Sequence, residues 1–186
     1  PVFKIFNSRS KLKFITTKIK GCYILEPKPF EDSRGYFSRI YCDNIFKKET
    51  NYNFRLKQIN QNFNKKASTL RGLHMQKEPH SETKIVRCVS GSIQDVVVDF
   101  RKDSNSYLDY VSLNLTEKNL KSLVVPRGCL HGYLTLEDNS CATYMVDQIY
   151  MPNSEIGYRY DDKKFNINWQ LQPLHISQKD LEWDFL

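Results

Sequence analysis

The chain has 186 residues, of which 40% are hydrophobic and 26% are charged. These proportions are typical of a folded globular protein and exclude an intrinsically disordered chain, since such chains are poor in aromatic residues. The formal net charge of +7 favours an anionic partner, which leaves nucleic acid, a membrane surface and a phosphorylated small molecule open. No linker or repeat divides the sequence, so we expect residues 1–186 to form a single domain.

Much of the positive charge lies in the first 20 residues, and the first acidic residue is Glu26. Apolar residues are interleaved with the basic ones, and residues 11–14 alternate with a period of two. This alternation predicts an edge strand whose lysines face solvent. We therefore expect residues 1–20 to form a basic N-terminal strand or extension. A nucleic-acid-binding arm is the alternative, but we expect neither nucleic acid nor a membrane as the partner.

Short runs rich in Val, Ile, Tyr and Phe recur along the rest of the chain. They predict strands at residues 21–25, 36–41, 84–89, 93–100, 110–115, 122–125 and 141–146. Ser90-Gly91 is typical of a tight hairpin between two of these strands. Residues 43–49 and a capping-box-like start at Ser177 predict short helices, the second near the C-terminus. The pattern predicts an all-β protein, an antiparallel sandwich or barrel, and favours a jelly roll.

The cysteines and the apolar runs bear on the compartment. No stretch approaches the about 18 consecutive apolar residues of a transmembrane helix, and the N-terminal residues contain no apolar run of the signal-peptide type. Scattered cysteines, odd in number and without a Cys-x-x-Cys pair, are typical of a reducing compartment rather than of a disulfide framework or a zinc site. They are Cys22, Cys42, Cys88, Cys129 and Cys141. We expect a cytoplasmic protein.

The histidines are the first candidates for chemistry. The run Pro126-x-Gly128-x-x-His131 resembles the second motif of the cupin superfamily, whose metal-binding members place a ligand at that histidine. The first cupin motif normally provides His-x-His, whereas His74 and His80 are six residues apart. Two ligands on one strand need an i, i+2 spacing, because successive strand residues face opposite sides. We therefore expect no metal site.

A series of motifs in a fixed order gives a more specific resemblance. In chain order they are Asp32-x-Arg34-Gly35-x-Phe37, Gln58-x-Asn60, Arg71-Gly72-Leu73-His74-x-Gln76, Lys84-x-Val86, Gly91-x-Ile93-x-Asp95-Val96-x-Val98-Asp99-x-Arg101, Pro126-x-Gly128-x-x-His131-Gly132, Tyr144, Tyr150-x-Pro152, Glu155 and Ile167-x-Trp169. Over residues 21–183 this order resembles the nucleotide-sugar 3,5-epimerase family. The resemblance implies a cupin-type jelly-roll barrel (a double-stranded β-helix), a homodimer, and a reaction without a metal or an organic cofactor.

The resemblance also implies a reaction. It is inversion of C3, C5 or both in a nucleoside-diphosphate 4-keto-6-deoxy sugar, a step of deoxysugar and surface-polysaccharide biosynthesis. Loss of a proton from C3 or C5 gives an enolate, so such an enzyme needs a base, an electrophile at the ketone oxygen and an acid on the opposite face. A histidine suits the base because it titrates near working pH. By resemblance the catalytic residues are His74 as base, Asp180 as its orienting partner, Lys84 as electrophile and Tyr144 as acid.

The remaining candidates are substrate-binding residues. Arg71 suits a diphosphate because its planar fork bonds two oxygens at once. Gln58 and Asn60 carry the amide donors and acceptors that read a base or a sugar edge. The resemblance implies that His131, Tyr150, Glu155 and Lys179 also contact the substrate. The whole predicted set is Arg34, Arg39, Gln58, Asn60, Arg71, His131, Tyr150, Glu155 and Lys179.

The sequence departs from the family pattern at Arg39, where the family usually has a Glu in the nucleotide pocket. A cation in place of an acceptor predicts altered base recognition, so a CDP- or GDP-linked sugar is an alternative to a dTDP-linked one. Ile149 likewise replaces one member of an aromatic pair. Two other functions stay open: a sugar 3,4-ketoisomerase on the same fold, and a non-catalytic cupin module that binds a sugar nucleotide or nucleic acid.

Overall fold

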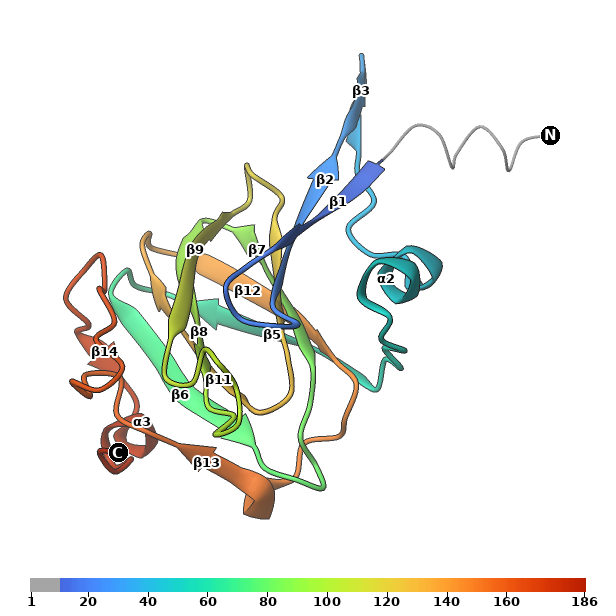
Figure 1. Cartoon of the computed structure of the whole chain (residues 1–186). Helices are drawn as coiled ribbons and strands as arrows, with labels where there is room; N and C mark the ends of the chain where they lie inside the picture. Colours follow the sequence, from blue (N-terminus) through green and yellow to red (C-terminus); the bar gives the residue numbers. More distant parts are fainter. Residues whose placement is uncertain (1–10) are drawn as a thin grey trace.

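The computed structural model describes residues 11–186, so the first half of the expected basic extension lies outside the described residues. Two six-stranded sheets face each other (Figure 1). In spatial order the first contains β1 (Lys11–Thr16), β2 (Tyr23–Lys28), β10 (Ser122–Val125), β7 (Lys84–Ser90), β12 (Ser140–Val146) and β5 (Gln58–Asn64). The second contains β13 (Glu155–Gly157), β6 (Thr69–Gln76), β11 (Cys129–Thr135), β8 (Ser92–Asp99) and β9 (Tyr110–Thr116), with β14 (His175–Ile176) beside β6.

The chain passes back and forth between these sheets. From β5 to β8, and again from β9 to β13, each strand lies in the opposite sheet from the strand before it. All strand pairs within the two sheets are antiparallel except the pair of β14 with β6. This winding is the jelly roll, and the expectation of an all-β cupin-type barrel is confirmed.

The remaining elements are short. Strands β3 (Phe30–Asp32) and β4 (Gly35–Phe37) form a separate hairpin, while α2 (Asp43–Thr50), the 3-10 helix η1 (Pro152–Ser154) and α3 (Gln178–Leu181) are the helices among the described residues. The helix expected at 43–49 is therefore confirmed. Ser177 caps α3, since its Oγ accepts a hydrogen bond from the backbone N–H of Asp180 at 3.1 Å. Within residues 11–186 no helix has both the length and the apolar character needed to cross a membrane.

Two local predictions need correction. The Ser90-Gly91 hairpin is wrong, because β7 and β8 belong to different sheets and Gly91 turns the chain from one to the other. Gly91 has φ +72°, and a Cβ there would lie 2.5 Å from Ser140 Oγ, so only glycine fits this crossing. The strand expected at 36–41 ends at Phe37, and residues 38–42 have no regular structure.

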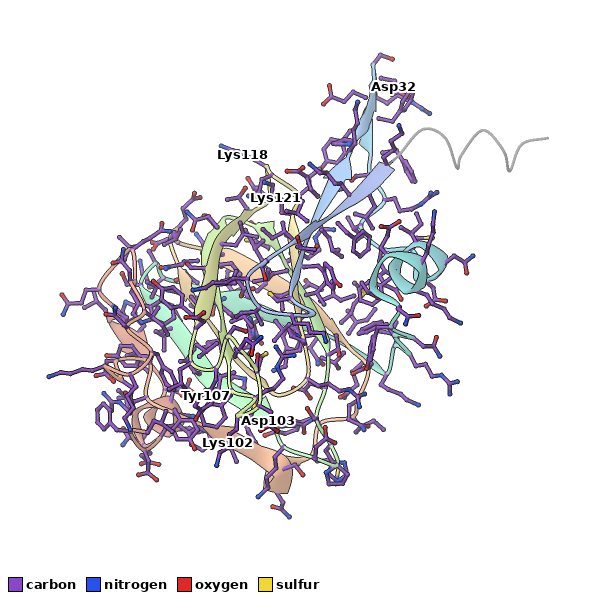
Figure 2. The ribbon with its side chains drawn as sticks, in the orientation of Figure 1. Asp32, Lys102, Asp103, Tyr107, Lys118 and Lys121 are labelled. Carbon is purple, nitrogen blue, oxygen red and sulfur yellow. The ribbon has the colours of Figure 1, made fainter. Side chains whose placement is uncertain are left out.

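Strand β1 confirms the edge strand for the described part of the N-terminus. It pairs only with β2 among the described strands, and Leu12 is buried while Lys11 and Lys13 are exposed. The β3–β4 hairpin extends away from the two sheets, with Asp32 at its far end (Figure 2). Every residue of these two short strands is exposed.

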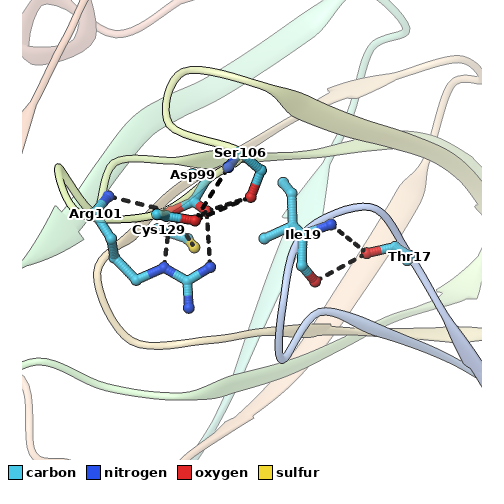
Figure 3. Close-up of polar contacts among 7 residues, drawn as sticks. Thr17, Ile19, Asp99, Arg101, Ser106 and Cys129 are labelled. Atoms are coloured by element: carbon cyan, nitrogen blue, oxygen red, sulfur yellow. Dashed lines mark hydrogen bonds and ion pairs between the residues drawn. The ribbon is translucent and has the colours of Figure 1, made fainter.

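The core lies between the sheets, and β8 is buried along its whole length. At its end the fully buried Asp99 accepts hydrogen bonds from Arg101 Nε (2.7 Å), Ser104 Oγ (2.6 Å) and Ser106 Oγ (2.7 Å) (Figure 3). Burial by itself would raise the pKa of Asp99, but these hydrogen bonds outweigh it and hold that pKa well below its usual range. The Asp99-x-Arg101 motif therefore has a structural role, which is to tie the loop after β8 to the core.

Candidate active site

A cavity of about 470 Å³ opens between the two sheets. Strands β5, β7 and β12 line it from the first sheet, β6, β11 and β13 from the second, and α3 closes one side. The cavity brings together most of the residues that the sequence analysis singled out. They are Gln58, Asn60, Arg71, His74, Lys84, His131, Tyr144, Tyr150, Glu155, Lys179 and Asp180.

A β-bulge in β6 explains the Arg-Gly-Leu-His spacing. His74 pairs with His131 of β11, and Arg71 pairs with Tyr133, so β6 uses one residue more than its partner between these points. Regular alternation would place Arg71 and His74 on opposite faces, but with the extra residue both line the cavity. Gly72 makes this possible, because it has φ +99° and a Cβ there would lie 2.5 Å from the His131 carbonyl oxygen.

Strand β5 lines the cavity with polar side chains, because its successive residues face alternately into the cavity and outward. Gln58, Asn60 and Asn62 line the cavity, whereas Ile59 and Phe63 point outward and are 61% and 54% exposed. The Gln58 side-chain carbonyl also accepts a hydrogen bond from the Tyr150 N–H at 2.9 Å. Asn62 was missed by the sequence analysis, although the i, i+2 pattern continues to it from Gln58 and Asn60.

His74 is surrounded by cations. Its Nδ1 is buried and has no hydrogen-bond partner among the described residues. Burial lowers the pKa of His74 well below its ordinary value of 6.5, and neighbouring basic side chains lower it further. In decreasing order of effect these groups are Lys84, His131, Lys179 and Arg71. The imidazole is consequently neutral at neutral pH, which is the form that a general base requires.

Asp180 lies in the cavity wall but is not hydrogen-bonded to His74. Its side chain is buried, and its Oδ2 accepts a hydrogen bond from Ser177 Oγ at 2.9 Å. The direct contact expected for an oriented His74–Asp180 pair is thus absent from the described residues. The N-cap of α3 fixes Asp180 at the cavity, so the two groups line one site without a hydrogen bond between them.

The histidine that does pair with a carboxylate is His131. Its Nε2 lies 2.8 Å from Asp95 Oδ1, and the two side chains are 7% and 0% exposed. Asp95 Oδ2 has no hydrogen-bond partner among the described residues. Asp95 belongs to the motif that begins at Gly91. Its pairing with His131 could not be predicted from the sequence, because β8 and β11 become neighbours only in the folded sheet.

Two ion pairs border the cavity. Lys84 Nζ lies 3.0 Å from Glu82 Oε1, and Lys179 Nζ lies 2.5 Å from Glu155 Oε2. Glu155 Oε2 also accepts a hydrogen bond from the Tyr150 hydroxyl at 2.7 Å. Nothing in the sequence pattern pointed to Glu82, which precedes β7 in a short polar segment.

Tyr144 and Arg71 complete the chemistry of the cavity. Burial raises the pKa of Tyr144 above its ordinary value, and the negative charge of Glu82 raises it further, so the phenol keeps its proton. Arg71 Nε donates to Asn64 Oδ1 at 2.9 Å, which fixes the guanidinium with its outer N–H groups still available. The site therefore combines a neutral imidazole, a protonated phenol and several fixed cations.

Arg34 and Arg39 are not brought to this cavity. Arg34 lies in the turn of the β3–β4 hairpin and binds Asp32 through its Nε at 3.1 Å. Arg39 follows the same hairpin in the segment without regular structure. Within residues 11–186, no group of three or more His, Cys, Asp or Glu side chains could hold a metal ion.

Comparison of the sequence with known proteins points to one family. The sequence matches the family model described as dTDP-4-dehydrorhamnose 3,5-epimerase over residues 16–186. The enzyme of that name from Methanothermobacter thermautotrophicus is 35% identical over 177 residues, which cover 94% of this chain and 94% of that protein.

Solved structures agree with the sequence match. The dTDP-4-dehydrorhamnose 3,5-epimerase of Bacillus anthracis, solved with TDP and pyrophosphate, has a TM-score of 0.90 and 33% identity, and the match covers 95% of this chain and 100% of that one. The dTDP-6-deoxy-D-glucose-3,5-epimerase of Legionella pneumophila, solved with dTDP-4-keto-L-rhamnose, has a TM-score of 0.89 and 28% identity, covering 94% and 93%. The chain therefore belongs to the dTDP-4-dehydrorhamnose 3,5-epimerase family of carbohydrate epimerases.

Proposed function

We propose that this protein inverts C3, C5 or both in a nucleoside-diphosphate 4-keto-6-deoxy sugar through an enolate. The observation that carries the proposal is that a neutral imidazole and a protonated phenol reach one cavity from opposite sheets. His74 comes from β6 and Tyr144 from β12, with the Lys84 ammonium between the sheets at the start of β7. Epimerisation needs this arrangement, because the proton must leave from one face of the carbon and return to the other.

Each catalytic group has a defined task. His74 removes the proton from the carbon beside the ketone, and Lys84 stabilises the negative charge that develops on the ketone oxygen. Tyr144 then delivers a proton to the opposite face of the same carbon. Asp180, held by Ser177 at the cavity wall, stabilises the imidazolium that His74 becomes. The same base serves C3 and C5 when the sugar presents each carbon in turn.

The cavity also offers groups for the rest of the substrate. Arg71 and Lys179 supply positive charge and N–H donors for a diphosphate. Gln58, Asn60 and His131 supply donors and acceptors for sugar hydroxyls or a base edge, and Tyr150 with Glu155 lines the mouth of the cavity. Related enzymes were solved with TDP or with dTDP-4-keto-L-rhamnose, which supports a sugar nucleotide as substrate.

A homodimer fits the surface of the chain. Tyr36 of the projecting hairpin is 58% exposed, and the outward face of β5 exposes Ile59 and Phe63. Burying such side chains against a second copy removes apolar surface from water. In a dimer the hairpin that carries Arg34, and the segment after it that carries Arg39, can serve the nucleotide of the neighbouring copy. Light scattering after size-exclusion chromatography tests this, with a monomer mass at micromolar concentration as the contrary result.

The cytoplasm is the proposed location. All five cysteines are free thiols and four of them are buried, a pattern typical of proteins in a reducing compartment. Measuring the protein in cytoplasmic and extracytoplasmic fractions of its cell tests this directly.

The experiment that tests the function is incubation in deuterated water with a panel of dTDP-, CDP- and GDP-linked 4-keto-6-deoxy hexoses and heptoses. Deuterium at C3 or C5 together with an inverted centre supports the proposal, and the nucleotide that reacts fastest answers the question raised by Arg39. Deuterium with a migrated carbonyl indicates the 3,4-ketoisomerase instead. Binding without exchange for any sugar indicates a non-catalytic module.

A further inference from the structure

Glu82 is a carboxylate inside the cavity whose charge raises the pKa of Tyr144 but which has no task of its own in the roles above. Its side chain is 9% exposed, and its Oε1 lies 3.0 Å from Lys84 Nζ, whose side chain is 8% exposed. Its other oxygen, Oε2, accepts a hydrogen bond from Gln76 Nε2. Both carboxylate oxygens are thus held by partners in the cavity wall, and one of those partners is the proposed electrophile.

Gln76 fixes Glu82 from the facing sheet. It is the last residue of β6, its side-chain carbonyl accepts a hydrogen bond from the Met151 N–H at 2.5 Å, and its Nε2 also donates to the His80 carbonyl at 3.0 Å. A side chain held at both ends cannot turn. The carboxylate of Glu82 therefore has a defined position. Gln76, which holds it, is in turn bonded to Met151, the residue that follows Tyr150.

The backbone between Glu82 and Lys84 is fixed as well. The N–H of Thr83 donates to Asp147 Oδ1 at 2.8 Å, and the other oxygen of Asp147 accepts hydrogen bonds from Arg127 Nη2 at 3.0 Å and from the Tyr52 hydroxyl. The residue between the two members of the ion pair is consequently anchored to Asp147, the residue that follows β12. Main chain and side chain both define where the pair lies.

The ion pair between Glu82 and Lys84 determines where the positive charge of Lys84 lies in the cavity. A lysine ammonium is a compact charge on a flexible stem of four carbons, and a buried ammonium without a counter-ion is poorly solvated. Lys84 Nζ lies 3.0 Å from Glu82 Oε1, and Lys84 also lines the cavity, so the carboxylate fixes the ammonium where it still faces the substrate space. Without the carboxylate, the ammonium would lose the contact that fixes its position in the cavity.

We propose that Glu82 is a positioning residue that holds the Lys84 ammonium where the enolate oxygen develops its charge. The inference rests on the role of Lys84 in the proposed function. It assigns to Glu82 an effect on the chemical step, through Lys84, and little effect on substrate binding.

The test is a double-mutant cycle on kcat and KM, measured as deuterium exchange into the reactive 4-keto sugar. The variants are Glu82→Gln, Lys84→Met and the double variant, together with Glu82→Asp. We expect Glu82→Gln to lower kcat by up to about 10²-fold, the scale of losing one transition-state donor, with KM nearly unchanged. Glu82→Asp keeps the charge and should recover most of kcat. In the Lys84→Met background, Glu82→Gln should cause no further loss.

Three results would overturn the inference: an unchanged kcat in Glu82→Gln, equal loss in Glu82→Gln and Glu82→Asp, or losses that multiply in the double variant. A Lys84→Met enzyme with full kcat would refute the proposed role of Lys84 and the inference with it, whereas a large loss in Lys84→Met beside a normal Glu82→Gln refutes the inference alone. Glu137 is an exposed glutamate that does not line the cavity, so Glu137→Gln is the matched control, and thermal unfolding of each variant separates misfolding from a kinetic effect.

Discussion

Replacing Gly72 by alanine perturbs the contact on which the catalytic spacing depends. Its backbone has φ +99°, and an added Cβ would lie 2.5 Å from the His131 carbonyl oxygen and 2.9 Å from Gly132 Cα. The unfavourable φ costs about 1–3 kcal/mol for a residue with a side chain. Forcing β6 away from β11 costs about 1–3 kcal/mol more, as in other overpacked sites. The sum is about 2–6 kcal/mol of folding stability.

For a chain of this size about 1 kcal/mol corresponds to a shift of about 2–4 °C in Tm, so Gly72→Ala should unfold at least about 4 °C below the parent. Its kcat should fall too, because Arg71 and His74 flank the displaced residue. Gly35→Ala is the matched control, since Gly35 has φ +123° but nothing lies within 4 Å of an added Cβ. Calorimetry and exchange kinetics on both variants provide the measurement. Equal Tm values for the two variants would refute the role of the close strand contact.

Three further predictions concern the pH dependence of activity, the pH dependence of stability and the N-cap of α3. Because burial and the nearby cations hold the pKa of His74 well below 6.5, the acid limb of kcat/KM should fall below pH 6.5, and a limb at or above that pH would contradict the neutral base. Hydrogen bonds keep the pKa of Asp99 low in the folded state, so its stabilisation is complete above the unfolded pKa of about 3.9 and is lost as pH falls below it. Asp99→Asn should therefore cost about 3 kcal/mol at pH 7 in urea unfolding and flatten the loss of stability below pH 4; an unchanged pH profile would argue against this network. Ser177→Ala should lower the free energy of unfolding by about 0.5–2 kcal/mol, and it should lower kcat because Asp180 loses the hydroxyl that holds it. An unaltered kcat would show that the N-cap of α3 has no part in catalysis.

The sequence allowed the fold class and most of the cavity residues to be predicted. Alternation along short apolar runs is a local signal, so strands such as 122–125 were found with their bounds. The order of motifs then identified the residues of β6, β7, β11 and β12 that meet in the cavity. The first kind of information is local, whereas the second comes from the resemblance of the whole motif order to the epimerase family.

What could not be predicted depends on contacts between distant segments. Ser90-Gly91 is a sequence that favours a hairpin turn. The sheet that each flanking strand joins is decided instead by packing against distant parts of the chain. The pairing of His131 with Asp95 follows from the adjacency of β8 and β11. Glu82 escaped because its importance comes from the contacts with Lys84 and Gln76 alone.

The most direct test of the central claim is proton exchange and product stereochemistry measured together for His74→Gln and Tyr144→Phe in deuterated water. If His74 is the base and Tyr144 the opposite-face acid, His74→Gln loses exchange by about 10²–10⁴-fold. Tyr144→Phe should then retain exchange while losing net inversion. Exchange at the parental rate in His74→Gln, or full inversion in Tyr144→Phe, would contradict the account.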